Sequence, residues 1–186
     1  MPEFFLDVSC VSVEIKRAGN NTSLLHFIHF QSDCNIPNTE ELYMIVSDIL
    51  SKKEDQLLTT TPDTQLNDAI DLLNTHNIGS LLVLEDDTLV GIITERDILR
   101  ATGENMDRLS SLKVRDLMTT DLVICSPEMA LAKVEVLMTG ERIRHLPVMQ
   151  DEKLVGLISI GDVVKARLQE SEAEAEELKN YIRTGR

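Results

Sequence analysis

The residues best suited to polar chemistry occur in two copies of one short motif. Thr94 and Asp97 stand three positions apart, and Ser159 and Asp162 repeat that spacing, each pair shortly after a Leu-Val-Gly triplet. A hydroxyl followed by a carboxylate at this spacing is typical of a helix start, where the two side chains bond to free backbone N–H groups. The same groups suit a ligand, because a carboxylate accepts two hydrogen bonds side by side and a helix start offers N–H groups to an anion. The two interpretations are compatible, and the recurrence of the motif favours a ligand role as well.

Both motifs lie inside an internal repeat, which shows when the chain is shifted by 65 residues. Residues 77–100 and 142–165 then match at nine of 24 positions, and a short segment before each copy, 46–50 and 114–118, also matches. Each copy has the pattern of a strand, a helix, two strands joined by an acidic turn, and a second helix. The predicted strands are Leu57–Thr60, Ser80–Leu84 and Leu89–Ile93 in the first copy, and Leu122–Cys125, His145–Met149 and Leu154–Ile158 in the second. The first helix carries on one face Leu66, Ala69, Ile70 and Leu73.

These elements predict an α+β protein of two tandem β-α-β-β-α repeats. The repeats cover 46–103 and 114–168, and residues 169–186 extend the last helix as a long, acidic C-terminal helix. A unit of about 55 residues is marginal as an independent core, so we expect the two repeats to pack as a pseudo-two-fold pair. Residues 1–43 hold all four phenylalanines, whereas residues 44–180 have no aromatic side chain other than histidine. We therefore predict that 1–43 is a dispensable extension of unassigned structure.

The composition narrows the classes of function. The net charge of −14 is opposite in sign to that of proteins that bind nucleic acid or anionic membranes non-specifically. The three cysteines, Cys10, Cys34 and Cys125, form no CxxC pair and predict no disulfide framework, which fits a reducing compartment. The N-terminus lacks the basic start of a signal peptide, and no apolar run reaches membrane-spanning length. We expect a cytoplasmic protein with neither a nucleic-acid nor a membrane partner.

The repeat resembles the CBS domain, named after cystathionine β-synthase. The resemblance rests on the element order, on the signature Gly-x-x-Thr/Ser-x-x-Asp at 91–97 and 156–162, and on the run Arg-His-Leu-Pro-Val at 144–148. It covers residues 46–168 as two CBS domains, a Bateman module, and the C-terminal region is similar to free-standing bacterial CBS-pair proteins. Such pairs bind adenosine compounds in clefts between the repeats and commonly dimerise. The resemblance implies a homodimeric, non-catalytic sensor of AMP, ADP or ATP, with Mg²⁺ if the ligand is ATP, acting on an unidentified partner protein.

The resemblance also implies roles for particular residues. Asp97 and Asp162 would accept the vicinal hydroxyls of a ribose. Phosphates would meet hydroxyl and basic groups, namely Ser159, Thr94, Arg144, His145, Arg96 and Lys165. With no aromatic ring to stack on, adenine would lie between mainly aliphatic residues and be recognised by backbone groups, the candidates being Leu58, Thr60, Val123, Cys125, Leu82 and Pro147. Core packing is the alternative for each of these, and the more basic second repeat is predicted to be favoured by anionic ligands.

Three further features leave alternatives open. Gly91 and Gly156 lie in mid-strand, which indicates either a bulge or a close approach of a ligand or strand to the backbone. Four zinc-type ligands stand near the N-terminus at a spacing that fits no common zinc site, namely Cys10, His26, His29 and Cys34. The last helix carries a heptad seam that could pack within the chain or across a dimer, formed by Val164, Leu168, Ser171, Ala175, Leu178 and Ile182.

Two other classes of function compete with a nucleotide sensor. An enzyme would need a nucleophile beside a base, but Cys125 lies in a predicted core strand and His76 ends a surface helix, so we expect no catalysis. A ligand-free dimerisation adaptor is compatible with the same fold, because a fold does not fix a function. The presence of both Asp97 and Asp162, each with its hydroxyl partner, favours the sensor.

Overall fold

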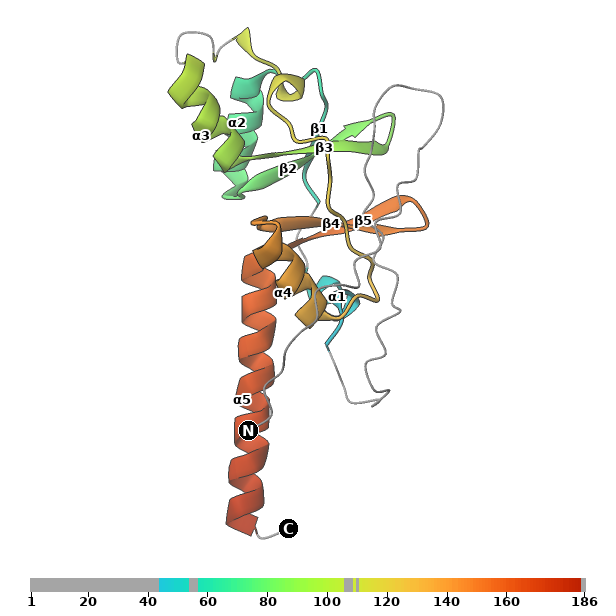
Figure 1. Ribbon diagram of the computed structural model, residues 1–186, viewed down its shortest axis with the longest axis vertical. Coiled ribbons are helices and arrows are strands. Elements are labelled where there is room, and N and C mark those ends of the chain that lie inside the picture. Colours follow the sequence, from blue (N-terminus) through green and yellow to red (C-terminus); the bar gives the residue numbers. More distant parts are fainter. Residues whose placement is uncertain (1–43, 54–56, 106–108, 110, 185–186) are drawn as a thin grey trace. The chain divides into compact units, whose positions relative to one another are not determined.

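The computed structural model describes residues 44–53, 57–105, 109 and 111–184, which divide into two compact units (Figure 1). The first unit is residues 57–124, and the second joins the described parts of 43–56 and 125–186. Both units contain helices as well as strands, and one helix continues to the end of the described chain. The predicted α+β class and long C-terminal helix are therefore confirmed.

The first unit is built on a three-stranded sheet in the order β1-β2-β3. Strand β1 (Thr59–Thr60) runs parallel to β2 (Ser80–Glu85), which forms an antiparallel hairpin with β3 (Thr88–Thr94). Helix α2 (Leu66–His76) precedes the hairpin, helix α3 (Glu95–Asn105) follows it, and a 3₁₀ turn, η2 (Val114–Asp116), comes last. Asp86 and Asp87 turn the hairpin with φ of 49° and 62°, a left-handed pair that Asp tolerates better than most residues. The predicted acidic hairpin turn is confirmed.

The core of the first unit joins one face of α2 to the sheet and to η2. Leu66, Ala69 and Leu73 are buried at the spacing of a helix face, while Ile70 is only partly buried. They pack with residues from the two long strands and from η2, namely Leu81, Val83, Ile93 and Val114. The segment around Val114, which begins the second repeat in sequence, is therefore part of the first unit's core.

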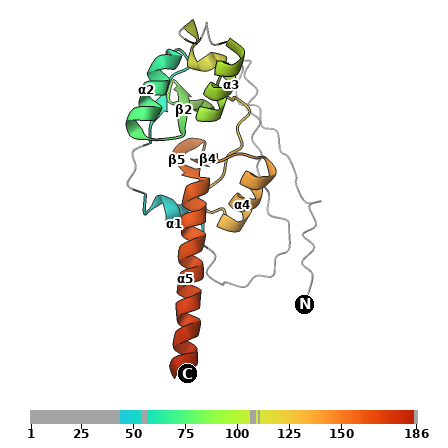
Figure 2. The same cartoon turned by 90° about the vertical axis from the view of Figure 1, so that its left-hand side faces the viewer.

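The second unit repeats this plan around one hairpin. Strands β4 (His145–Gln150) and β5 (Lys153–Ser159) are antiparallel, and Asp151 and Glu152 form the same left-handed turn with φ of 48° and 63°. Three helices accompany the hairpin: α1 (Val46–Leu50), α4 (Leu131–Gly140) and α5 (Ile160–Thr184). Figures 1 and 2 both show the second half of α5 extending past α1 and α4.

The strand predicted at Leu122–Cys125 is wrong. Only Cys125 pairs with β4, through its N–H to the Pro147 carbonyl at 3.0 Å and through its own carbonyl to the Met149 N–H at 2.9 Å. Pairing one residue further back would need an N–H at position 147, and proline has none. Leu82 stands at the equivalent place in the first repeat, and there β1 keeps two paired residues.

Each repeat gives its leading segment to the other unit. Residues at the start of the first repeat bond to the second unit, through Val46 N–H to the Met129 carbonyl and Leu131 N–H to the Met44 carbonyl, both at 3.0 Å. The matching segment at the start of the second repeat bonds in the same way to the residues just before α2, through Val114 N–H to the Thr64 carbonyl at 2.9 Å. The predicted repeats 46–103 and 114–168 are thus sequence repeats, whereas the compact units divide the chain at other points.

The two mid-strand glycines accommodate these exchanged segments. A Cβ at Gly91 would lie 2.8 Å from the Met118 sulfur, and a Cβ at Gly156 would lie 2.8 Å from a methyl group of Leu50. Leu50 and Met118 occupy equivalent places in the two leading segments. The hairpins also shift register opposite both glycines. Bulge and close approach therefore occur together, and the approaching group is a segment of this chain.

Alanine at Gly91 is expected to lower the free energy of unfolding by roughly 1–3 kcal/mol, the usual cost of overpacking. Its Cβ would also lie 3.1 Å from the Thr119 carbonyl oxygen, which accepts a hydrogen bond from Ile92 and cannot move freely. Urea denaturation measures the change. Gly103→Ala is the control, because nothing lies within 4 Å of a Cβ there; it should stabilise α3 by up to about 1 kcal/mol. A Gly91→Ala protein as stable as wild type would contradict the packing argument.

Candidate functional site

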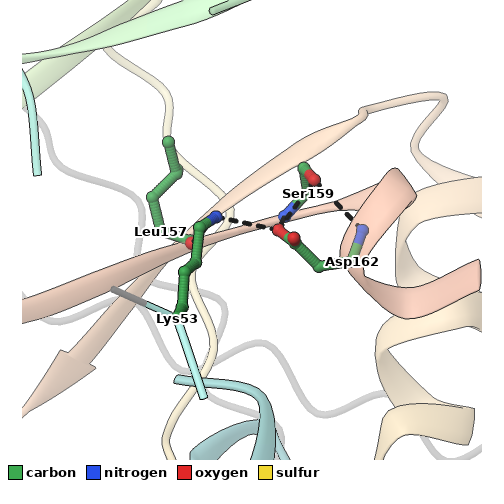
Figure 3. Close-up of polar contacts among 4 residues, drawn as sticks. All are labelled: Lys53, Leu157, Ser159 and Asp162. Atoms are coloured by element: carbon green, nitrogen blue, oxygen red, sulfur yellow. Dashed lines mark hydrogen bonds and ion pairs between the residues drawn. The ribbon is translucent and has the colours of Figure 1, made fainter. Parts of the chain in front are cut away.

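The hydroxyl–carboxylate motifs form the same bonded arrangement at the starts of α3 and α5. The Ser159 N–H and hydroxyl donate to Asp162 Oδ2 at 2.8 and 2.7 Å, and the Asp162 N–H donates back to the hydroxyl at 3.2 Å (Figure 3). Thr94 and Asp97 repeat these bonds at 3.0, 2.6 and 3.4 Å. The capping interpretation of both motifs is confirmed.

A lysine that the sequence did not point to completes the arrangement at Asp162. Lys53 Nζ lies 2.9 Å from Asp162 Oδ2 and 3.3 Å from the Leu157 carbonyl oxygen (Figure 3). The side chains of Lys53 and Asp162 are each only 24% exposed, so water screens the pair incompletely. Lys53 reaches this place because α1, just before it, belongs to the second unit.

The charge state of Asp162 follows from these contacts. Burial would raise the pKa of the Asp162 carboxyl, but the hydrogen bonds from Lys53 and Ser159 outweigh it, and the pKa lies below its ordinary value. The carboxylate is therefore ionised at neutral pH. All three donors reach Oδ2, so Oδ1 is the oxygen that faces no donor among these residues.

A pocket of about 360 Å³ opens beside the ion pair, within the second unit. Its walls come from the region of α1 and from the first turns of α5: Met44, Asp48, Ile49, Lys52, Lys53, Asp162, Lys165, Ala166 and Gln169. Three lysines and two aspartates make the lining net positive in a chain of net charge −14. Lys165, predicted to meet phosphate, thus lies in one pocket with Asp162, predicted to hold ribose.

The two motifs differ in their charged surroundings. The Asp97 carboxylate accepts hydrogen bonds from the N–H and hydroxyl of Thr94. Extending the match between 46–50 and 114–118 by three residues places Asp121 where the second unit has Lys53. The motifs are therefore alike as helix caps, but a lysine neutralises the aspartate of the second.

The other predicted phosphate residues are placed in two groups. In the second unit, His145 pairs with Ser159 across the hairpin, and the Arg144 carbonyl accepts the Ile160 N–H at 2.8 Å, so both adjoin the motif. Arg144 is exposed and His145 is half-buried. Arg96 is exposed in the first turn of α3, in the first unit. Phosphate binding by these residues stays a prediction.

The predicted adenine residues lie mostly in the interior of the units. Thr60 and Leu82 are buried in neighbouring strands of the first unit, where Leu58 and Val123 are partly buried. Cys125 and Pro147 are buried and hydrogen-bonded to each other in the second. Burial raises the pKa of the Cys125 thiol to about 12, which keeps it protonated and unreactive at neutral pH. These contacts are those of core residues, and a role in binding adenine stays a prediction.

Several predictions fall on residues that are not described. The assignment of 1–43 as a dispensable extension and the zinc-type ligands Cys10, His26, His29 and Cys34 lie outside the described residues. Within the described chain, no group of three His, Cys, Asp or Glu residues is placed to hold a metal ion. No described helix is both long enough and apolar enough to span a bilayer.

The family follows from the repeat, the fold and the motif geometry taken together with sequence comparison. The CBS domain profile matches residues 46–104 and 114–169, and the chain belongs to the CBS domain family. It is 38% identical over 149 residues to the CBS domain-containing protein CBSX3, mitochondrial, of Arabidopsis thaliana, covering 75% of this chain and 72% of that protein. It is also similar to the crystal structure of the CBS-domain containing protein ATU1752 from Agrobacterium tumefaciens, with a TM-score of 0.65, 37% identity, and 67% of this chain and 99% of that one covered.

Two further similar structures carry ligands. The crystal structure of CBSX2 in complex with AMP has a TM-score of 0.58 and 30% identity, covering 68% of this chain and 98% of that one. The CBS domain pair of protein MJ0100, in complex with 5′-methylthioadenosine and S-adenosyl-L-methionine, has a TM-score of 0.60 and 25% identity, covering 70% and 99%. Adenosine is the chemical group that these three ligands share.

Proposed function

We propose that this chain is a non-catalytic regulatory module that binds an adenosine nucleotide, AMP, ADP or ATP, and signals its presence to a partner protein. The observation that carries the proposal is the ionised, half-buried Asp162 carboxylate beside a pocket lined by three lysines. A carboxylate suits a ribose diol, and ammonium groups suit phosphate. The AMP and S-adenosylmethionine complexes of similar structures support an adenosine ligand.

In this proposal the second unit supplies the dominant anion site. Asp162 accepts the ribose hydroxyls, and Lys165 with Ser159 meets the phosphates, while Arg144 and His145 approach from the start of β4. Asp97 and Thr94 offer a weaker site for anions in the first unit. Mg²⁺ would accompany ATP if ATP is the ligand. The cleft between the repeats remains a prediction, and so does the cytoplasmic location.

The test is the effect of nucleotides on the melting temperature of the full chain. A ligand that binds only the folded state stabilises it by mass action, so AMP, ADP or ATP should raise the melting temperature. Guanine nucleotides should raise it less, because backbone groups would recognise the 6-amino edge of adenine. If no adenine nucleotide changes the melting temperature at millimolar concentration, the proposed function is wrong.

The homodimer, which is expected of the sensor and of the adaptor alternative alike, is supported by an apolar stripe on α5. Val164, Leu168, Leu178 and Ile182 are 50%, 59%, 61% and 74% exposed although they occupy heptad positions. We propose that a second copy of α5 covers this stripe in parallel orientation. In a parallel pair Arg167 and Glu172 flank the seam at positions that face each other across the two copies, whereas an antiparallel pair does not bring them together. Within its own chain Arg167 pairs with Glu170 and Glu135.

Glutamate at both Leu168 and Ile182 is expected to weaken a homodimer at least about tenfold, because each pairing buries four carboxylates. Light scattering over a range of concentrations measures the change. Leu99→Glu is the matched control, since Leu99 is an exposed leucine (72%) on another helix. A wild-type monomer at micromolar concentration would refute the homodimer, and an unchanged double variant would refute pairing through α5.

A further inference from the structure

We propose that Lys53 makes the Asp162 site selective for phosphorylated adenosine ligands over adenosine itself. This inference rests on the proposed function and concerns the same pocket. Asp162 Oδ2 already accepts three hydrogen bonds, two from Ser159 and one from the Lys53 ammonium. A ligand hydroxyl that approaches this carboxylate therefore enters a site whose negative charge is already paired.

The free-energy cost of binding at this carboxylate depends on whether the ligand provides a new negatively charged partner for Lys53. The ammonium is held by Asp162 at 2.9 Å and by the Leu157 carbonyl at 3.3 Å, in a place where the side chain is 24% exposed. A ribose diol that takes both carboxylate oxygens needs Oδ2 as well as Oδ1, so it displaces the Lys53 ammonium from Oδ2, replaces it by a neutral hydroxyl and leaves the ammonium poorly compensated. Adenosine has no anionic group that could pair with the Lys53 ammonium, so its binding at Asp162 is weakened.

A phosphate removes this cost because it provides a new anion for the displaced ammonium. Lys53 lines one pocket with Lys52 and Lys165, so a phosphate there meets three ammonium groups. Lys53 can then exchange its carboxylate partner for phosphate, while Asp162 turns to the ribose. Charge-assisted bonds of this kind are about twice as strong as neutral ones.

The Asp97 motif serves as the internal comparison. Its carboxylate bonds to Thr94, and the equivalent of Lys53 in sequence is Asp121. A ligand that binds at Asp97 therefore does not have to displace a lysine at the position equivalent to Lys53. Asp121, which stands at that position, also provides no positive charge for a phosphate. We expect this motif to discriminate little between adenosine and AMP.

The experiment measures the affinities of adenosine and AMP by isothermal titration calorimetry in the full chain carrying Asp97→Ala, which isolates the Asp162 site. Lys53→Met is expected to weaken AMP roughly tenfold and to leave adenosine as tight or tighter, because Asp162 no longer has to be released. Lys52→Met is the matched control. Lys52 is an exposed lysine of the same pocket that does not contact Asp162, so its loss should weaken AMP less and leave adenosine unchanged.

The outcomes separate this inference from the function on which it rests. If Lys53→Met weakens adenosine and AMP by the same factor, or leaves AMP unchanged, Lys53 is not the selective group and the inference is overturned. If neither compound binds the protein with Lys53 intact, the proposed function itself has failed. Should Lys53→Met not fold, Lys53→Arg decides: the cation is kept, so the preference for AMP should persist, and a loss of that preference would count against the inference.

Discussion

Alanine at Asp162 should remove most of the rise in melting temperature that AMP or ATP produces. A ribose diol held in the pocket would lose its acceptor, and a buried hydrogen-bonding group left without a partner costs roughly 1–3 kcal/mol, or about 5- to 150-fold in affinity. Lys53 would also lose its carboxylate partner. The measurement is a melting curve at increasing nucleotide concentration for wild type and variant, read as the ligand-induced shift and not as the melting temperature itself.

The capping role of the same aspartate requires a control. Loss of the cap alone should change stability by about 1 kcal/mol, equally with and without nucleotide. Asp97→Ala removes the same cap geometry at the start of α3 and should leave more of the nucleotide-induced shift. A full shift in the Asp162→Ala protein would show that the carboxylate is only a helix cap.

Removal of residues 1–53 should destabilise the second unit by at least about 3 kcal/mol, the scale of losing several well-packed core groups. Val46 is completely buried, Leu50 fills the space over Gly156, and Lys53 pairs with Asp162. All three are lost together with the backbone bonds to residues 129–131. Thermal unfolding and hydrogen exchange of the amides in β4 and β5 measure the effect.

A chain that starts at Met44 is the matched control for this deletion. It retains α1 and Lys53 and should keep the stability and nucleotide response of the whole protein, as the composition break at this point predicts. Equal melting temperatures of the two shortened proteins would show that α1 contributes nothing to the second unit. A loss of several degrees on removal of 1–43 would instead place that extension within the folded module.

Much of the fold could be predicted because the sequence pattern of most helices and strands occurs twice, once in each repeat. The acidic turns, the helix face of Leu66, Ala69 and Leu73, and the helix starts at Thr94 and Ser159 depend on local spacing, which sequence reports directly. The missing strand at Leu122–Cys125 could also have been foreseen. Pro147 has no N–H to offer at the place where Leu82 of the first repeat supports one more pair.

Only part of the candidate site could be predicted, because some of its residues are close in sequence and others are far apart. The carboxylate and hydroxyl of each motif are three residues apart, whereas Lys53 and Asp162 are 109 residues apart. The match between 46–50 and 114–118 revealed the leading segments, but nothing in it indicates that each packs against the other repeat. Lys53 followed from that exchange, and so could not be found by reading either motif alone.

The exchange of leading segments also sets an order of events on the ribosome. Every described element of the first unit lies within 57–124, so its partners are complete once that stretch has emerged. Helix α1 is made earlier, yet the residues that it contacts follow about 80 to 110 positions later. At a synthesis rate of about 5–20 residues per second, the nascent α1 segment waits for roughly 5–20 seconds. The first of the described helices to be synthesised is thus among the last to find its place, and the unit that carries Asp162 closes around it after the other unit can already have folded.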